Sequence, residues 1–250
     1  MTNILGVRID TVSKEQALEK ILNLATHLEH SYVVTINPEQ LYDAYYNSNF
    51  KDILNCSDLN LCDGVGVKLA SFLFPPVIKD IVAGSGILKD VLQNAVAKKN
   101  KVLVLITANA LSSKEKIEKY LIEYLEMSKE HVLVIKTTEV SSKSVVNAIT
   151  LFKPNITFLS HNHILANDLI HQMGTMGVTG VKINVGGSFD YLLGLRKSPP
   201  KIFKYFGIEW LYRLVNEPAY RYKRVFKATI LFPLLVLSTK IRLTYSNIKE

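Results

Sequence analysis

Short apolar runs of strand length alternate with helix-length amphipathic segments along most of the chain, and this alternation limits the folds open to it. Repeated strand and helix units of this size form mostly parallel sheets with helices on both faces. We therefore predict an α/β fold. The runs with strand character are Tyr32–Ile36, Leu59–Cys62, Val102–Ile106, Val132–Ile135, Ile156–Leu159 and Val181–Val185.

Local signals indicate where the intervening helices begin. Ser13 with Gln16, and Ser112 with Glu115, have the spacing of a capping box, in which each side chain pairs with the other residue's backbone N–H. Pro38 suits the first turn of a helix. We expect helices from these three positions, and further elements at Ile87–Ala97, Val145–Leu151, Ile164–Met173 and, as a short strand, Ile4–Val7.

Positive charge is concentrated in the last part of the chain. The 250 residues, 48% of them hydrophobic, carry a formal net charge of +8 and can bury a full core. From Arg196 onward, twelve Lys and Arg stand against three acidic residues, which leaves the earlier part slightly acidic. We expect a core over residues 1–195 and a basic appendage over residues 196–250. The appendage should meet a polyanionic partner, whether a membrane surface, a diphosphate or a nucleic acid.

Three sequence features indicate the cellular compartment of the protein. Cys56 and Cys62 form neither a disulfide framework nor a metal-ligand pattern, which favours a reducing compartment. The N-terminal segment carries polar residues throughout, unlike a signal peptide. No run reaches the ~20 apolar residues that a spanning helix needs. We expect a cytoplasmic protein.

The Asp-Gly step at Asp63 and Gly64 follows the run Leu59–Cys62 and precedes a helix-like segment. Asp63 therefore belongs at the carboxyl end of a strand, the edge of an open α/β sheet where ligands bind. A carboxylate there can accept a proton from a substrate hydroxyl, or it can simply cap the next helix. Thr35 and Asn37 occupy the same kind of turn after the preceding strand, so a hydroxyl, an amide and a carboxylate come from adjacent strand ends.

Two other turns contain residue types found in ligand sites. Gly84 and Gly86 can let backbone amides approach a phosphate, or they can simply form a turn. His161 and His163 follow another strand, but no third metal ligand stands at a suitable spacing. We expect solvated or substrate-facing histidines there and no metal.

The apolar run Ala228–Ser238 is too short to span a bilayer, but it suits the membrane interface between Lys227 and Lys240. A competing hypothesis packs this run against the core or a second subunit. The positive charge on both sides favours the membrane. Aromatic residues of the appendage favour the same boundary: Trp210, Tyr212, Tyr220 and Tyr222.

Four segments carry a specific resemblance: TINPE, DGVGV, GGSFD and GIEWLYRLVNEP. Together, and in this order, they resemble the WecG/TagA/CpsF family of bacterial glycosyltransferases. The resemblance implies a Rossmann-like core and an inverting transfer of N-acetylmannosamine or another hexose from a UDP-sugar. The implied acceptor is an undecaprenyl-diphosphate-linked saccharide, as in cell-surface polysaccharide or teichoic acid biosynthesis.

Residues that match the family's motifs give the expected site. Asp63 matches the proposed base, and Thr35 and Asn37 match two pocket residues. Appendage residues that match arginines on the donor diphosphate are Arg213, Arg221 and Arg224. The remaining expected substrate-binding residues are Gly64, Gly84, Asn162, Asn167, Gly186, Gly187 and Asp190.

The chemistry agrees with this assignment. An inverting transfer needs a base for the acceptor hydroxyl and a cation for the departing UDP. The chain has no DxD-type acidic pair that could hold a metal ion. An arginine guanidinium can take the place of the metal, because two of its N–H groups bind phosphate at once. We therefore expect a metal-independent enzyme without a cofactor. The arginines could instead be solvated or bind lipid headgroups.

The resemblance also implies partners. We expect the appendage to contact the inner face of the cell membrane, and the chain to self-associate when it is off the membrane. Nucleic acid is not an expected partner, because the basic tail lacks a recognition motif. A nicotinamide dehydrogenase is not expected either, because no strand ends in G-x-G-x-x-G.

Several positions depart from the family pattern. Family members usually carry a Gly-x-Pro-x-Gln-Glu turn after the strand Ile156–Leu159, and charged residues at three further places. The residues at these positions here are Asn162, Ile164, Ala166, Asn167, Ile81, Gly86 and Ser198. The alternative hypothesis is therefore a catalytically degenerate, membrane-associated partner subunit of another glycosyltransferase.

Overall fold

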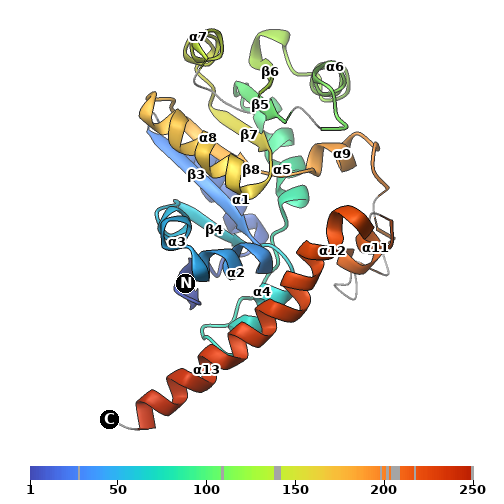
Figure 1. Cartoon of the computed structure of the whole chain (residues 1–250). Coiled ribbons are helices and arrows are strands. Elements are labelled where there is room, and N and C mark those ends of the chain that lie inside the picture. Colours follow the sequence, from blue (N-terminus) through green and yellow to red (C-terminus); the bar gives the residue numbers. More distant parts are fainter. Residues whose placement is uncertain are drawn as a thin grey trace.

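The computed structural model describes residues 1–27, 29–107, 110–137, 142–197, 199–200, 203, 209–216 and 218–248, without the side chains of 209, 213, 218–220 and 246–248. Six strands form one parallel sheet in the order β4-β3-β8-β7-β5-β6 (Figure 1). The predicted α/β fold is confirmed. The strands are β3 (His30–Ile36), β4 (Leu59–Cys62), β5 (Val102–Ile106), β6 (Val132–Lys136), β7 (Ile156–Ser160) and β8 (Gly180–Asn184).

Helices cover both faces of the sheet, as the alternation predicts. The elements on one face are α1 (Lys14–Leu24), α5 (Gly84–Ala97), α6 (Lys114–Lys119), the π-helical turn η1 (Tyr120–Tyr124) and α9 (Ser188–Leu192). Those on the other are α2 (Pro38–Tyr46), α3 (Ser48–Asn55), α4 (Val65–Ser71), α7 (Lys143–Phe152) and α8 (His163–Thr175). A 3-10 turn, η2 (Lys129–His131), precedes β6.

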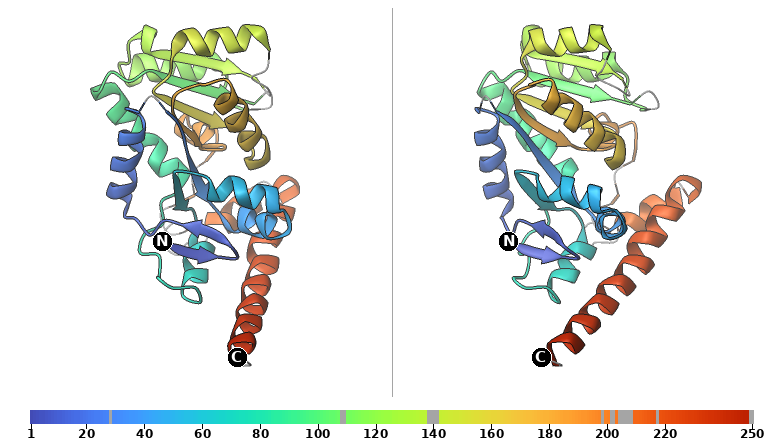
Figure 2. Two further views of the ribbon diagram at one scale, coloured as in Figure 1. Left: turned by 90° about the vertical axis from the view of Figure 1, so that its left-hand side faces the viewer. Right: turned by 60° about the vertical axis from the view of Figure 1, so that its left-hand side comes forward.

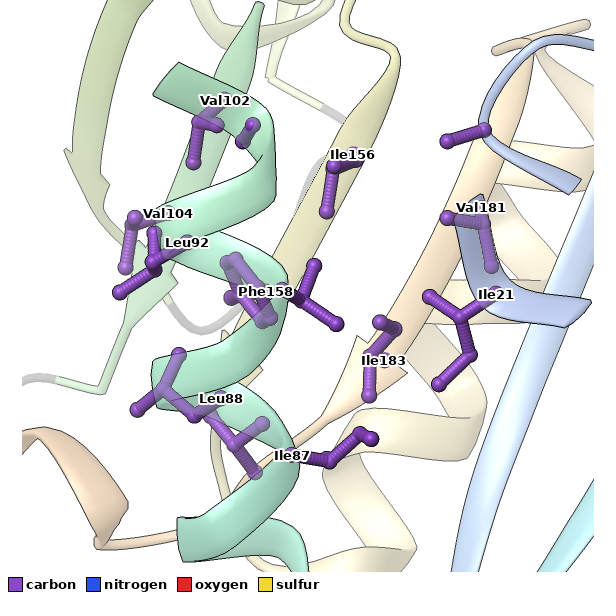
Figure 3. Close-up of a cluster of buried hydrophobic side chains, with 14 of the residues drawn as sticks. Ile21, Ile87, Leu88, Leu92, Val102, Val104, Ile156, Phe158, Val181 and Ile183 are labelled. Atoms are coloured by element: carbon purple, nitrogen blue, oxygen red, sulfur yellow. The ribbon is translucent and has the colours of Figure 1, made fainter. Parts of the chain in front are cut away.

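The largest core lies between the sheet and the helices α1 and α5. Figure 3 shows Leu88 and Leu92 of α5 over Val104 and Phe158 of the strands. All five residues of β5 are buried, since parallel strands in this class are covered on both sides. Each fully buried aliphatic or Phe side chain contributes ~1.5–3 kcal/mol.

The N-terminal segment differs from its prediction. Instead of one strand over Ile4–Val7, an antiparallel hairpin forms from β1 (Thr2–Ile4) and β2 (Val7–Ile9). Leu5 and Gly6 make its turn with φ values of +56° and +87°. The prediction was wrong because an apolar residue occupies a left-handed turn position, where glycine or asparagine is usual.

The helix starts are partly as predicted. Ser13 caps α1, and the capping box with Gln16 is present. The second box was wrong, because α6 is capped by Ser113 instead of Ser112. Helix α5 begins at Gly84, so both glycines of that turn lie in its first turn.

Two residues at the amino end of β8 are fitted closely to their surroundings. Gly180 has a φ of +76°, and a Cβ there would lie 2.4 Å from the carbonyl oxygen of Asn155. Lys182 is 0% exposed, and its Nζ donates hydrogen bonds to the carbonyl oxygens of Val178, Thr179 and Gly180. Burial lowers the pKa of Lys182 to about 7.

The appendage is helical and consists of α11 (Glu209–Asn216), α12 (Pro218–Phe226), the π-helical turn η3 (Lys227–Leu231) and α13 (Phe232–Ile248). The last three form one long rod that leads away from α6 and α7 (Figures 1 and 2). Phe232, Leu235 and Val236 are buried in the cluster that contains Leu41 and Ala44 of α2. Packing against the core, the competing hypothesis for the apolar run, is therefore correct for these three residues.

The opposite side of the rod carries exposed apolar residues at helical spacing, here called the apolar stripe. Its members are Tyr222, Phe226, Ile230, Leu234, Leu237, Ile241 and Tyr245. Among the residues that the structure describes, no helix combines the length and the apolar character needed to cross a bilayer.

Candidate functional site

The candidate site lies where β3, β4 and β8 end. The chain leaves β3 into α2 on one face of the sheet and leaves β8 toward α9, on the face that carries α5. Neighbouring strands whose connections leave in opposite directions open a crevice at their carboxyl ends. We call Thr35, Asn37, Asp63 and Gly84 the strand-end site.

Thr35 and Gly84 lie next to each other at the strand ends. Thr35 is buried, and its Oγ1 lies 3.5 Å from the carbonyl oxygen of Asn184. A Cβ on Gly84 would lie 3.4 Å from Thr35 Oγ1 and 3.8 Å from Val185 Cα. Gly84 thus lets the first turn of α5 approach the strand ends closely. A helix N-terminus offers free N–H groups and a positive dipole, which suit an anion.

Asp63 is partly exposed at the end of β4. Its backbone N–H donates to the carbonyl oxygen of Ile36 at 2.7 Å, which continues the parallel pairing and brings Asp63 beside Asn37. The N-cap of α4 is Gly64, with a φ of +106°, and within the described part of the chain no side-chain hydrogen bond caps this helix. The geometry thus does not support helix capping as the role of Asp63.

Asn37 is held by the helix it precedes. Its Oδ1 accepts from Gln40 N at 3.0 Å, and Gln40 Oε1 accepts from Asn37 N at 2.9 Å. This reciprocal capping box fixes the amide plane of Asn37 at the start of α2.

Asp190 has contacts that favour a structural role. It is 4% exposed, and its Oδ1 accepts from Ser112 N at 3.0 Å and from Ser112 Oγ at 2.6 Å. Its Oδ2 accepts from Arg196 Nε at 3.1 Å. The carboxylate thus ties α9 to the loop after β5 and to the first residue of the appendage. Ser112 was missed as its partner, because the two residues are 78 positions apart.

The turn before α9 contains Gly186 and Gly187. The carbonyl oxygen of Gly186 accepts from Ser160 Oγ at 2.7 Å, and its φ is +51°. A Cβ on Gly187 would lie 3.9 Å from Asp190 Oδ2. This turn therefore joins the ends of β7 and β8.

At the end of β7, Asn162 caps α8 by accepting from Leu165 N at 3.0 Å. Asn167 is only 5% exposed, and its Nδ2 lacks a hydrogen-bond partner among the residues described. The side-chain donor of Asn167 is thus buried and unpaired, whereas the oxygen of Asn162 is already engaged.

The two histidines of this turn have different partners. His161 Nε2 lies 2.8 Å from the carbonyl oxygen of Thr137, and burial lowers the pKa of His161. His163 Nε2 lies 3.3 Å from Asp43 Oδ2. Over the described part of the chain, no group of three or more His, Cys, Asp or Glu could hold a metal ion.

Cations of the appendage reach both sides of the strand-end site. Arg221 Nη2 lies 3.4 Å from the hydroxyl oxygen of Tyr191, which follows Asp190 in α9. Arg224 Nε donates to Glu39 Oε2 at 2.7 Å, only two residues beyond Asn37. The side chain of Arg213 in α11 lies outside the described residues, and so does Ser198.

Helix α2 receives a second cation one turn further on. Lys227 Nζ donates to Asp43 Oδ1 at 2.7 Å. Burial alone would raise the pKa of Asp43, but hydrogen bonds from His163 and Lys227 outweigh burial, so the pKa lies below its ordinary value. Sequence reasoning missed Glu39 and Asp43, although their four-residue spacing on a helix was visible.

A pocket of about 200 Å³ opens between α9, α11 and the start of the appendage. Small-molecule sites usually measure ~300–1,000 Å³, so it can hold only part of a nucleotide sugar. The lining residues are Leu111, Tyr191, Leu195, Arg196, Lys197, Tyr212 and Asn216.

The profile of the family described as "Glycosyl transferase WecG/TagA/CpsF family" matches residues 2–246. The chain belongs to this family. Membership confirms the resemblance carried by the four sequence segments of this WecG/TagA/CpsF protein.

The names of curated relatives agree with membership of this family. A Bacillus spizizenii protein named N-acetylglucosaminyldiphosphoundecaprenol N-acetyl-beta-D-mannosaminyltransferase is 27% identical over 216 residues, covering 82% of this chain and 82% of the relative. Proteins of the same name from Staphylococcus aureus strains MRSA252 and MW2 are 25% identical over 221 residues, covering 86% of this chain and 84% of each relative.

Proposed function

We propose that this WecG/TagA/CpsF protein transfers a sugar, N-acetylmannosamine-like or another hexose, from a UDP-sugar to a polyprenyl-diphosphate-linked saccharide. Family membership and the names of the relatives support the reaction class and the acceptor. The observation that carries the site assignment is Asp63, a partly exposed carboxylate at a strand end whose neighbouring helix is capped by Gly64.

In the proposed reaction, Asp63 accepts the proton of the acceptor hydroxyl as its oxygen attacks the anomeric carbon of the sugar. The bond between that carbon and the UDP oxygen breaks, and its electron pair leaves with UDP. Attack from the side opposite UDP inverts the configuration. Thr35 and Asn37 orient the sugar, and the turn at Gly186 and Gly187 lines the crevice.

The departing diphosphate needs positive charge, and we assign this role to Arg213, Arg221 and Arg224 without a metal or cofactor. Arg221 and Arg224 already contact α9 and α2, which flank the strand-end site. The turn of α5 at Gly84 adds backbone N–H groups. Gly64, Asn162 and Asn167 are further proposed substrate contacts.

Residues 1–195 would form the transferase core, and residues 196–250 a membrane-binding appendage. The apolar stripe is long and continuous, and basic residues lie along the same rod. A helix of this kind can lie in the interface with its apolar side in lipid. We therefore propose a protein on the inner face of the cell membrane that acts in teichoic acid or related cell-surface polysaccharide synthesis, with self-association when it is off the membrane.

The direct test is a screen. The full-length protein is incubated with a panel of UDP-sugars and a short-chain lipid-diphosphate-GlcNAc, and both UDP release and the glycosylated lipid are measured. We expect one donor to give both products in equal amounts. UDP release without glycosylated lipid, or neither product with any donor, would contradict the proposed reaction.

The proposed role of Arg224 can be tested by substitution, with the neighbouring Lys223 as a matched control. Arg224→Gln should lower kcat/KM for the donor ~10-fold or more, because a charged contact to phosphate is lost. Lys223→Gln, which changes an exposed neighbour, should have little effect. Glu39→Gln breaks the ion pair but keeps the arginine, so a loss in this variant as large as in Arg224→Gln would assign the effect to appendage docking instead.

The alternative is a noncatalytic partner subunit. It is favoured by the end of β7, where Asn162 is engaged as a cap and Asn167 is buried, so that this turn presents no carboxylate. Calorimetry with UDP separates the hypotheses. UDP binding that is weakened by Arg224→Gln supports the enzyme, whereas no binding and no turnover support the partner subunit.

A further inference from the structure

A second apolar surface lies beside the strand-end site, on the segment of residues 65–82, here called the lip. The lip leaves the site directly after Asp63 and Gly64 as α4. It returns to the same strand end, where the backbone N–H of Val82 donates to the carbonyl oxygen of Cys62 at 2.8 Å. Both ends of the lip are therefore fixed within one or two residues of Asp63.

Large apolar side chains of the lip face outward. Leu69 is 59% exposed and Phe72 is 61% exposed, and they lie three residues apart, on the same side of this helical turn. Val77 and Ile81 add to this surface and are each 39% exposed. Four such residues lie within thirteen positions beside the proposed site, a higher local density than the scattered exposed apolar residues that are normal on a protein surface.

Internal hydrogen bonds hold the lip in this shape. Ser71 is 0% exposed, and its Oγ donates to the carbonyl oxygen of Lys68 at 2.6 Å and accepts from Ile78 N at 3.0 Å. Thr2 Oγ1 donates to the carbonyl oxygen of Phe74. The outward position of Leu69 and Phe72 is thus part of a braced structure, with Ile78 buried beneath it.

The lip is continuous with the appendage. Its inner residues Val67, Ala70 and Ile78 belong to the same buried cluster as Phe232 and Leu235 of α13. In Figures 1 and 2 the lip and α13 lie at the same end of the molecule, opposite α6 and α7. The lip and the appendage therefore pack against each other, and each also carries exposed apolar residues.

The charges around the lip are mainly positive. Lys68 donates to the carbonyl oxygen of Lys79 at 2.5 Å, and Lys240 Nζ of α13 lies 5.6 Å from the centroid of the Phe74 ring. Asp80 is the one acidic residue between positions 65 and 82. Outward apolar side chains with lysines around them suit a bilayer with anionic headgroups.

We infer that the lip is a second membrane-contact surface, which inserts Leu69 and Phe72 into the headgroup boundary and sets the strand-end site against the bilayer. The inference rests on the proposed function in one respect: a lipid-linked acceptor presents its diphosphate and sugar at that boundary. Two separate contacts, the lip and the appendage, would fix the distance and tilt at which Asp63 meets the acceptor more closely than the apolar stripe of one helix does.

The test uses a single reporter tryptophan in the full-length chain. Trp210→Phe removes the native tryptophan, and Phe72→Trp places a new one on the lip. Leu151→Trp is the matched control, because Leu151 of α7 is 81% exposed at the opposite end of the molecule. With vesicles of phosphatidylglycerol and phosphatidylethanolamine, the Phe72→Trp emission should shift to the blue, and brominated acyl chains should quench it.

The control tryptophan should show neither effect. Equal quenching at both positions, or no quenching at position 72 while the protein floats with vesicles, would overturn the inference. No vesicle binding by either variant would overturn it too. Because no donor or acceptor is present, a failed transferase assay leaves this result intact.

A binding measurement completes the test. Leu69→Ser combined with Phe72→Ser should weaken vesicle flotation ~10-fold or more, whereas Tyr124→Ser combined with Leu151→Ser should not change it. Circular dichroism confirms that both double variants are folded. Equal vesicle affinities for the two variants would contradict a membrane contact by the lip.

Discussion

The two ends of the sheet use polar residues in different ways. At the carboxyl end, Asp63 is partly exposed and leaves the capping of α4 to Gly64. At the amino end, Lys182 is fully buried and its amine is satisfied by three carbonyl oxygens, while Gly180 leaves no space for a side chain. The comparison teaches that changes at the carboxyl end should affect catalysis, and changes at the amino end should affect folding.

The largest effect should follow Asp63→Asn. The amide has nearly the same shape but cannot accept a proton, so the transfer rate should fall ~10²–10⁴-fold. Thermal unfolding should change less than in Gly180→Ala, because the Asp63 side chain is partly exposed and the N-cap of α4 is Gly64. A variant with normal turnover, or one that unfolds several degrees earlier, would break the contrast between the two ends.

Gly180→Ala should give the opposite result. A Cβ would lie 2.4 Å from Asn155 O and 2.6 Å from Pro154 O, at a backbone φ of +76°. The free energy of unfolding should fall by ~2–4 kcal/mol. Urea titration measures this loss, and the rate per folded molecule at low temperature should match the wild type. Gly177→Ala, with a φ of +68° but open space around its Cβ, is the control for backbone strain alone.

The pH dependence of the free energy of unfolding tests the buried position of Lys182 at the amino end. The folded pKa of Lys182, about 7, lies below that of the unfolded chain, so between pH 7 and 10 the unfolded chain binds more protons. Burial of the charge therefore costs most below pH 7, and wild-type stability should rise by about 2 kcal/mol from pH 7 to 9. Lys182→Met should lack this rise. The same slope in both proteins would assign it to other groups.

Ser112→Ala tests whether Asp190, a buried and paired residue at the carboxyl end, acts in folding instead of catalysis. Asp190 lies there but is buried and paired, like the polar residues of the amino end. Loss of the Ser112 hydroxyl should cost about 1 kcal/mol in unfolding free energy, since the backbone N–H still donates to Asp190. Donor KM should stay within about twofold, and Ser113→Ala provides a neighbouring control at the N-cap of α6. A larger change in donor KM than in stability would instead favour contact between Asp190 and substrate.

Much of the fold could be predicted from the sequence, because strand and helix periodicity is local. The run Val102–Ile106 is β5 with the same bounds, and the box at Ser13 caps α1. The second box was wrong by one residue, since Asp190 recruits the hydroxyl of Ser112 from far along the chain. Such a tertiary contact leaves no local pattern.

The candidate site was predictable in part for the same reason. Asp63 and Asn37 directly follow strands, and Thr35 is the penultimate residue of β3 instead of a turn residue, so the three could still be grouped from topology alone. The ion pairs of Arg224 with Glu39 and of Lys227 with Asp43 could not, because they depend on how the appendage docks. The pairing of Gly84 with Thr35 likewise required the helix to extend through two glycines that usually end one.

Helix α2 carries Asn37 at its first end and the ion pairs of Glu39 and Asp43 along its side. The orientation of the substrate and the docking of the appendage therefore both depend on α2. Thermodynamic reciprocity follows: if docking strengthens donor binding by some factor, donor binding strengthens docking by the same factor. An enzyme saturated with donor would then hold its appendage against α2 more tightly than the donor-free enzyme does.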